Sequence, residues 1–272
     1  MRSTFLCCAA LLLTACGLAM SNEDRLDRAE QALGAGDYRA AIIDAKDVLR
    51  DEPDNVRGRI LLGRASVAVG DGASAEKELR RAIELGVDRG EILVPLARGL
   101  LEQRKFGAIV DEIRPDEAIS SDDAVELRLV RGDAFMGLGQ PAVARELYED
   151  VLTAKPDNIG AHLGVAASYA AESNVTEAQR VLEHVTDTYA EDVRGWLALA
   201  ELRFASRNYK GAATDYETAT RVAASESNIG AQVQAISGLA DTQFLLGDTD
   251  DARNSVARVS ELAPDSLQAL FL

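Results

Sequence analysis

Polar, turn-like stretches interrupt the apolar pattern of this chain at an almost constant interval. A hexamer that ends in a small or apolar residue recurs as GDYRAA (36–41), GDGASA (70–75), RKFGAI (104–109), GQPAVA (139–144), SNVTEA (173–178), RNYKGA (207–212) and GDTDDA (247–252). The final residues of these hexamers are spaced by 34, 34, 35, 34, 34 and 40 positions. A period of this length predicts a helix–turn–helix unit that is repeated about seven times.

Each recurring marker has a physical reason in such a unit. A glycine ends one helix because left-handed backbone angles cost little without a Cβ; these glycines are Gly36, Gly70, Gly139 and Gly247. An aspartate then caps the next helix by accepting bonds from unpaired backbone N–H groups; these are Asp37, Asp71 and Asp248. The alanine that ends most hexamers is small because two antiparallel helices approach closely there. A proline twelve residues later, at Pro53, Pro156 and Pro264, stops the second helix.

Two places depart from the pattern. In the third unit Ile109 replaces the alanine, and Arg114-Pro115 cuts the following helix short, so we expect a local distortion. Between the sixth and seventh units the spacing grows, and the extra residues at 225–230 are expected to lengthen a helix pair or its connection.

Composition and charge support an all-helical protein and exclude some partners. Alanine, leucine, arginine and glutamate are abundant, whereas only 6 prolines and few aromatic residues occur. The chain has 29 Lys and Arg against 45 Asp and Glu, a net charge of −16. This acidity argues against a nucleic-acid partner, because phosphate binding needs a basic surface.

The start of the chain has the pattern of an export signal. Arg2 is the only charge before Glu23, and the apolar run from Phe5 to Leu13 is shorter than the roughly 20 residues of a membrane span. The segment Leu13-Thr14-Ala15-Cys16 resembles the lipobox of bacterial lipoproteins, which implies that residues 1–15 are removed and that Cys16 is acylated. Residues 16–21 then form a tether, and an ordinary cleaved signal is the alternative.

The lipoprotein resemblance also implies a location. Gly17 is not the aspartate that favours retention in the inner membrane. The expected location is the outer membrane of a Gram-negative cell, facing the periplasm, with the acyl chains as the only contact with the membrane. Cys7 and Cys8 lie in the removed segment, so the mature chain has one cysteine and no internal disulfide.

Residues 22–266 resemble the tetratricopeptide repeat. Leu62-Gly63, Ala82, Tyr148, Trp196 and Ala219 occupy positions where that family places its packing residues. The resemblance implies an all-α, right-handed superhelix of about seven stacked helix pairs with one continuous core. Residues 267–272 are then expected to begin an incomplete further repeat, and the C-terminal end is expected to present an apolar patch.

The first 110 residues more closely resemble the tetratricopeptide-repeat lipoprotein of the exosortase/PEP-CTERM system. The resemblance rests on the lipobox, on "AEQALGAGDYRAAIIDAKDVLRDEPDNVRGRILLGR" and on "GASAEKELRRAIELGVD". Members of that family are far longer than 272 residues, so the resemblance implies a short or truncated member. The resemblance implies a scaffold that binds envelope proteins of an exopolysaccharide or protein-sorting machinery. The alternatives are a pilotin-like or outer-membrane assembly lipoprotein and, less favoured, an enzyme of polysaccharide or cell-wall turnover.

Residues that could perform chemistry are few. The two histidines, His162 and His184, lie on different predicted helices, and no nucleophile–base pair or set of metal ligands accompanies them. Asp248, Asp250 and Asp251 lack the loop of a calcium site and are expected to be a helix cap with solvated charges. We therefore expect a non-enzyme without metal, cofactor or small-molecule substrate.

Binding is the remaining role, and the concave side of the array is the candidate surface. One column of first-helix positions that are expected to face it reads Arg64, Arg98, Asp133, Ala167, Glu201 and Asp241. With Arg57 and Arg59 nearby, the groove is predicted to be basic at its N-terminal end and acidic farther along. The alternative is that these residues are ordinary solvated helix faces. The Lys/Asn combination that clamps a C-terminal carboxylate in chaperone-binding relatives is absent from the column.

Overall fold

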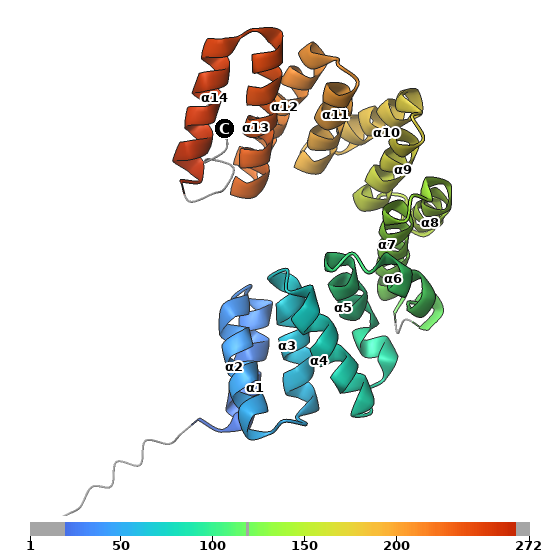
Figure 1. Ribbon diagram of the computed structural model, residues 1–272, viewed down its shortest axis with the longest axis vertical. Coiled ribbons are helices and arrows are strands. Elements are labelled where there is room, and N and C mark those ends of the chain that lie inside the picture. Colours follow the sequence, from blue (N-terminus) through green and yellow to red (C-terminus); the bar gives the residue numbers. More distant parts are fainter. Residues whose placement is uncertain (1–19, 118–119, 265–272) are drawn as a thin grey trace, which may run out of the picture.

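The protein is described by a computed structural model that covers residues 20–117 and 120–264. Within these ranges the chain forms fourteen α-helices and one short 3-10 helix, and no β-strand. Consecutive helices pair as seven antiparallel hairpins, which confirms the all-α repeat architecture (Figure 1).

The helices follow the sequence period closely. The first helices of the seven pairs are α1 (Asn22–Gly34), α3 (Val56–Ala68), α5 (Arg89–Glu102), α7 (Ser121–Gly137), α9 (Ile159–Ala171), α11 (Val193–Ala205) and α13 (Ile229–Leu246). The second helices are α2 (Tyr38–Asp51), α4 (Gly72–Glu84), α6 (Phe106–Glu112), α8 (Pro141–Ala154), α10 (Val175–Thr188), α12 (Tyr209–Ser225) and α14 (Thr249–Leu262).

Most predicted helix boundaries are confirmed. The four hexamer glycines adopt positive φ angles of 72° to 90°, as a left-handed C-terminal turn requires. Asp37 and Asp71 accept bonds from the backbone N–H groups of Ala40 and Ser74, at 3.1 and 3.0 Å. The cap predicted for Asp248 is wrong, because its side chain accepts no capping bond.

Buried apolar residues form a series of clusters between neighbouring helices along the stack. The hexamer alanines Ala41, Ala75, Ala144, Ala178 and Ala212 are fully buried, which confirms the close helix approach. Tyr148 on α8 is also buried, and its ring lies between Gly132 on α7 and Gly164 on α9. A Cβ at Gly132 would lie only 2.4 Å from that ring, so the backbone itself forms the slot for the tyrosine.

Both predicted irregularities are present. The helix α6 has only 7 residues and is followed by the 3-10 turn Pro115–Glu117, which confirms the distortion of the third repeat. The insertion before the seventh repeat lengthens α12 to 17 residues and α13 to 18, against 13 or 14 in most other helices. The added residues therefore lengthen the second helix of the sixth pair and the first helix of the seventh, and the two helices still pack against each other.

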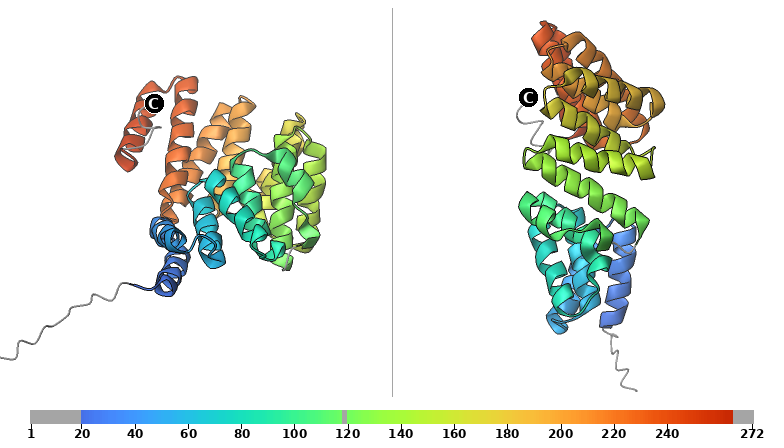
Figure 2. Two further views of the ribbon diagram at one scale, coloured as in Figure 1. Left: turned by 60° about the horizontal axis from the view of Figure 1, so that its bottom comes forward. Right: turned by 90° about the vertical axis from the view of Figure 1, so that its right-hand side faces the viewer.

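The stacked pairs follow a curved path (Figures 1 and 2). Pairs α1–α2 and α13–α14 lie at opposite ends of the curve, and both ends flank its open side. First helices lie toward that open side, as α7 does relative to α8 in Figure 1. A concave surface built from first helices is therefore available for binding.

Three predictions concern residues outside the described ranges. The signal peptide at 1–15, the acylated Cys16 and the further repeat at 267–272 all lie there. Among the residues that are described, no helix combines the length and the apolar character that crossing a membrane requires.

Candidate protein-binding groove

The six positions of the predicted column lie on first helices, one position on each of six consecutive repeats. All six positions, Arg64, Arg98, Asp133, Ala167, Glu201 and Asp241, are solvent-exposed and come from α3, α5, α7, α9, α11 and α13. Arg64 and Arg98 line one shallow hollow between α3 and α5, and Ala167 and Glu201 line another between α9 and α11.

The first hollow lies between α3 and α5. Arg64 and Arg98 stand at its edge, and Val67, Ala68, Val94 and Pro95 complete its wall around about 250 Å³. An apolar pocket between two guanidinium groups suits a segment with a carboxylate next to an aliphatic or aromatic side chain.

Arg64 also has a local structural contact in this hollow. Pro95 lies inside α5 and has no N–H, so it leaves the carbonyl oxygen of Glu91, four residues earlier, without its helical partner. The Nη2 group of Arg64 donates to that oxygen at 3.4 Å, which is long for such a bond. Arg64 therefore keeps most of its donor capacity.

The other arginines at this end are already paired. Arg57 donates to Glu23 and Asp27 at 2.9 and 2.8 Å and also binds Glu30, so three carboxylates of α1 surround one guanidinium group. These bonds raise the pKa of Arg57, with the bond to Glu30 contributing most. Arg59 is mostly buried against Glu78, and Arg98 pairs with Glu126 at 2.8 Å. The positive potential at the N-terminal end of the groove is therefore weaker than the number of arginines there indicates.

The opposite half of the groove is acidic, and the hydroxyl of a buried tyrosine lies near its carboxylates. Tyr216 on α12 is 5 % exposed, and a Cβ at Gly238 would lie 2.8 Å from its hydroxyl oxygen. Burial, with the negative charges of Glu201 and Asp241, raises the pKa of Tyr216 to about 12. The tyrosine hydroxyl therefore stays protonated, with two groove carboxylates near it.

Tyr148 occupies the equivalent place in the fourth repeat but has a partner. Its hydroxyl donates to Asp133 at 2.7 Å. Burial raises the pKa of Asp133, although this bond opposes the change. In the sixth repeat the corresponding carboxylate, Glu201, instead accepts a bond from Gln234 at 2.8 Å. Tyr148 and Tyr216 occupy the same position within their repeats. This shared position is the sequence signal from which a tyrosine near a carboxylate could have been predicted in both repeats.

The groove contains a second apolar hollow farther along its length. It lies between α9 and α11, and Ala167, Ala170, Ala198 and Leu202 line it together with Glu201. Asp241 follows on α13, where partial burial raises the pKa of its carboxyl group. The groove thus presents apolar pockets with cations at one end and carboxylates at the other.

The histidines form no catalytic or metal-binding arrangement in the described part of the chain. The rings of His162 and His184 lie 5.8 Å apart, and Nε2 of His162 is 2.9 Å from the carbonyl oxygen of Pro156. No group of three or more potential metal ligands occurs among residues 20–117 and 120–264. The two histidine rings therefore make a local contact between α9 and α10.

Comparisons with known proteins identify the class of fold. Residues 32–93 and 135–202 match the family described as Tetratricopeptide repeat. A tetratricopeptide repeat protein from Parabacteroides merdae ATCC 43184 superposes with a TM-score of 0.66 at 17% identity, over 90% of this chain and 94% of that one. The apo form of RapI superposes with a TM-score of 0.58 at 11% identity, over 91% and 78% of the two chains. MamA superposes with a TM-score of 0.51 at 22% identity, over 61% and 90%.

The fold is thus a tetratricopeptide-repeat solenoid. This fold generally serves as a non-catalytic scaffold for protein–protein interaction. The seven hairpins give the chain the fold of these solved structures, and two stretches of it resemble the tetratricopeptide repeat.

Proposed function

We propose that the concave groove binds a segment of another protein in one fixed direction. An acidic part of the segment would lie at Arg64 and Arg98, and a basic part at Glu201 and Asp241. The observation that supports this most is the placement of Arg64 and Arg98 around one apolar pocket, opposite in charge to the far half of the groove. Complementary charges at the two ends of the groove would fix the direction in which the segment binds more than they would raise its affinity.

The cellular setting is part of the same proposal. The lipobox at Leu13–Cys16 supports an outer-membrane lipoprotein that faces the periplasm, with Cys16 as the acylated residue. The resemblance of the first 110 residues supports a role in exopolysaccharide production or PEP-CTERM protein sorting. A pilotin-like or outer-membrane assembly lipoprotein is the alternative, and neighbouring genes would distinguish the two.

The anchor is tested by the substitution Cys16→Ser. We expect the variant to remain unacylated and to leave the outer-membrane fraction, since the thiol is the attachment point. Membrane fractionation and the mass of the processed protein measure this. Wild-type fractionation together with wild-type mass would refute the lipoprotein assignment.

The groove is tested by the double substitution Arg64→Gln and Arg98→Gln. Neutral glutamine is preferable to glutamate because a carboxylate at position 98 would repel Glu126. We expect reduced capture of specific proteins from detergent-solubilised envelopes and reduced exopolysaccharide yield. Stability should change by no more than about 0.5 kcal/mol, as for most exposed positions.

A matched control removes two cations elsewhere. Arg50 on α2 and Arg180 on α10 are exposed residues of second helices, and each pairs with a residue of its own helix. Arg50→Gln with Arg180→Gln changes the net charge by the same amount without altering the groove. Equal effects of the two double variants would show that total charge matters and that the groove does not.

A further inference from the structure

The shortened third repeat leaves a notch beside the fourth repeat. Helix α6 has 7 residues against 14 in α8, and the 3-10 turn Pro115–Glu117 follows it in place of further α-helical turns (Figure 1). A hollow of about 410 Å³ lies between α6, this turn, α7 and α8. Its charged lining residues are Arg114, Arg128, Arg131, Asp111 and Asp116, and Leu147 is part of its wall. We call this hollow the third-repeat notch.

Arg131 stands at a position that is apolar in most repeats. The equivalent residues of the other first helices are Leu62, Leu96, Val165, Leu199 and Leu239, and all five are buried. The first helix pair is the exception, because Arg28 occupies the position there. The two arginines can therefore be compared within one fold.

Arg28 shows what an arginine at this position binds. Its Nε donates to one oxygen of Asp44 at 2.6 Å, and its Nη2 donates to the other oxygen. These two N–H groups lie on one side of the guanidinium plane and match the two oxygens of a carboxylate. Asp44 is buried, on the second helix of the same pair, three residues after the hexamer alanine. The position is thus built to hold a carboxylate on the side of the guanidinium group.

The fourth repeat lacks the carboxylate that would complete this pair. Three residues after its hexamer alanine stands Leu147. In other repeats the same second-helix position carries Glu78, Glu112 or Asp215, and each of these forms an ion pair with an arginine. Leu147 is therefore an apolar residue at a position where a carboxylate usually meets an arginine.

The donors of Arg131 that correspond to those of Arg28 have no partner in the described part of the chain. Only its Nη1 is used, and it donates to the carbonyl oxygens of Val110 and Ile113. These two bonds hold the guanidinium group in place, with Nε and Nη2 left over. The notch therefore contains a fixed donor pair without an acceptor.

A second arginine adds donors to the same notch. Arg128, one helical turn before Arg131, uses Nη1 for the carbonyl oxygen of Ala124 at 3.1 Å and forms no ion pair with residues 20–117 or 120–264. Burial and the nearby Arg114 lower the pKa of Arg131, while the charge of Asp116 acts in the opposite direction. Positive charge is thus concentrated in the notch although the chain as a whole has a net charge of −16.

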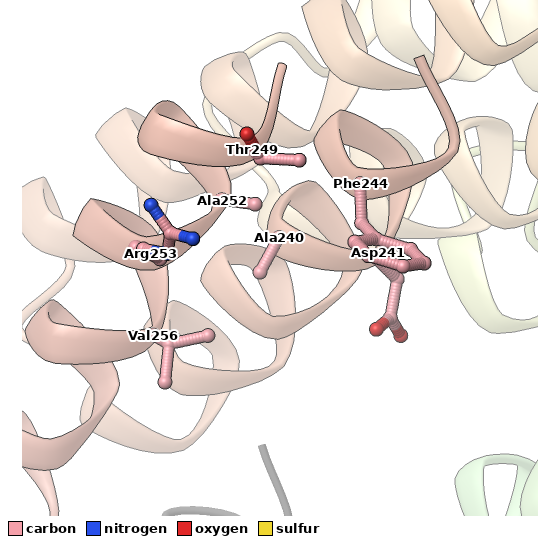
Figure 3. A pocket seen from close by; sticks show the side chains of 7 residues that line it. All are labelled: Ala240, Asp241, Phe244, Thr249, Ala252, Arg253 and Val256. Carbon is pink, nitrogen blue, oxygen red and sulfur yellow. The ribbon is translucent and has the colours of Figure 1, made fainter. Parts of the chain in front are cut away.

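The pocket between α13 and α14 has no comparable arrangement (Figure 3). It lies on the face on which a following repeat stacks in a solenoid. Arg253 is the single cation in its lining. This arginine is 78% exposed and already pairs with Asp250 at 2.9 Å. The third-repeat notch is therefore the stronger candidate for a ligand site.

We infer that the third-repeat notch binds the carboxylate of a small organic acid. Nε and Nη2 of Arg131 donate to its two oxygens, as the same atoms of Arg28 donate to Asp44, and Arg128 supplies a further donor. The apolar body of the acid packs on Leu147. The volume of the notch lies within the range of about 300–1,000 Å³ that is typical of small-ligand pockets. This site is separate from the groove between first helices.

The sharpest test returns the missing carboxylate to the chain. We expect Leu147→Asp to occupy Arg131 as Asp44 occupies Arg28, and so to abolish binding of phenylacetate. Isothermal titration calorimetry on the purified protein at low ionic strength measures binding, and thermal unfolding checks the fold. Leu147→Asn is the matched control, because asparagine has the same shape without the charge and should leave most of the binding.

Two further variants change the charge of the notch in opposite directions. We expect Arg128→Gln to weaken phenylacetate binding by about tenfold, the loss that follows from removing a hydrogen bond to a charged group. We expect Asp116→Asn to tighten it, because a carboxylate that competes for Arg131 is removed. Arg131 itself is left unchanged in these tests, since its Nη1 also binds the carbonyl groups at the end of α6.

The groove variant separates this site from the proposed protein-binding groove. Arg64→Gln with Arg98→Gln should leave phenylacetate binding unchanged, whether or not it affects protein capture. A loss of phenylacetate binding in this double variant would move the acid to the groove and overturn the inference.

Three other outcomes also overturn it. The first is no phenylacetate binding to the wild-type protein. The second is an equal effect of Leu147→Asp and Leu147→Asn, because the added charge would then be irrelevant. The third is tighter binding of the peptide acetyl-Ala-Glu-Ala amide than of phenylacetate, which would make an acidic protein segment the occupant of the notch.

Discussion

Each turn between paired helices places one residue in the left-handed backbone conformation. The free-energy cost of this conformation differs between repeats because the residue differs. Four of these turns use glycine at the left-handed position, whereas three use Arg104 (φ 56°), Ser173 (φ 63°) and Arg207 (φ 62°). A side chain in this conformation costs roughly 1–2 kcal/mol. The fold imposes the same turn geometry on every hairpin, whether or not the residue favours it.

The substitution Arg207→Gly is therefore expected to stabilise the protein. Relief of the left-handed strain exceeds the added chain entropy of glycine, roughly 0.5–1 kcal/mol, so the expected gain is up to about 1 kcal/mol. Urea unfolding measures it. Gly36→Ala, at the equivalent turn with φ of 79°, is the converse control and should lose up to about 1 kcal/mol. Changes of the same sign at both positions would contradict the argument.

At the scale of one element, the short helix α6 shows how a broken repeat is completed. Its last carbonyl groups have no helical partners after Glu112. Arg131 of α7 donates to the carbonyl oxygens of Val110 and Ile113, and Arg89 of α5 donates to that of Glu112. Burial lowers the pKa of Arg131, and the nearby Arg114 adds to this, yet the group remains a cation that caps a helix end.

Removal of this cap should destabilise the third repeat. We expect Arg131→Ala to lower the free energy of unfolding by about 1–3 kcal/mol, because buried carbonyl groups would lose their donor. Hydrogen exchange should locate the loss in α6. Arg128→Ala is the control, since Arg128 donates only within its own helix, to Ala124 at 3.1 Å. An equal loss from both variants would assign the effect to packing of α7 and not to the cap.

Across the whole molecule, polar side chains on second helices reach the first helix of the next repeat. Glu76 on α4 accepts bonds from Gln103 at the end of α5 and from Lys105 at the start of α6, at 2.8 and 2.6 Å. Arg145 on α8 binds Glu172, and Glu183 on α10 binds Arg203 of α11. In a repeat protein each unit contacts only its neighbours, so such bonds contribute to the coupling between repeats.

Glu76 makes this coupling dependent on pH. Burial opposes its charge, but bonds from Lys105, Gln103 and Arg80 outweigh burial and lower the pKa of Glu76 from 4.5 to about 2. A carboxyl group with a lowered folded-state pKa stabilises the protein above its unfolded pKa, and the contribution disappears as the pH falls to about 2. The relevant window therefore lies between about 4.5 and about 2.

We expect Glu76→Gln to lose about 1–2 kcal/mol at pH 7 and progressively less below pH 4.5. Thermal unfolding across this range, compared with the wild type, measures the change. Glu84→Gln on the same helix is the control, because Glu84 is exposed and pairs with Arg81 only three residues away. A deficit for Glu76→Gln that stays constant down to pH 2 would exclude the ionised carboxylate as its source.

The sequence by itself determined the repeat architecture. Residues that mark the hairpins act over one turn of chain: Gly36 permits a left-handed angle, Asn55 caps α3, and Pro115 prevents α6 from continuing. Such effects depend on the chemistry of one residue and its neighbours, so the pattern reveals them. The all-α class, the seven hairpins, the irregular third repeat and the lengthened helices where the sixth and seventh repeats meet were therefore predictable.

Tertiary structure alone decided which charges remain available for binding. Arg57 and Arg64 look alike in the sequence, but three carboxylates from α1 occupy Arg57, whereas Arg64 has one long bond to a carbonyl oxygen that Pro95 leaves unpaired. The hydroxyl of Tyr216 near Glu201 and the exposure of Arg253 likewise depend on helices that are distant in the chain. Electrostatic pairing is set by distances between repeats, and a periodic sequence does not specify those distances residue by residue.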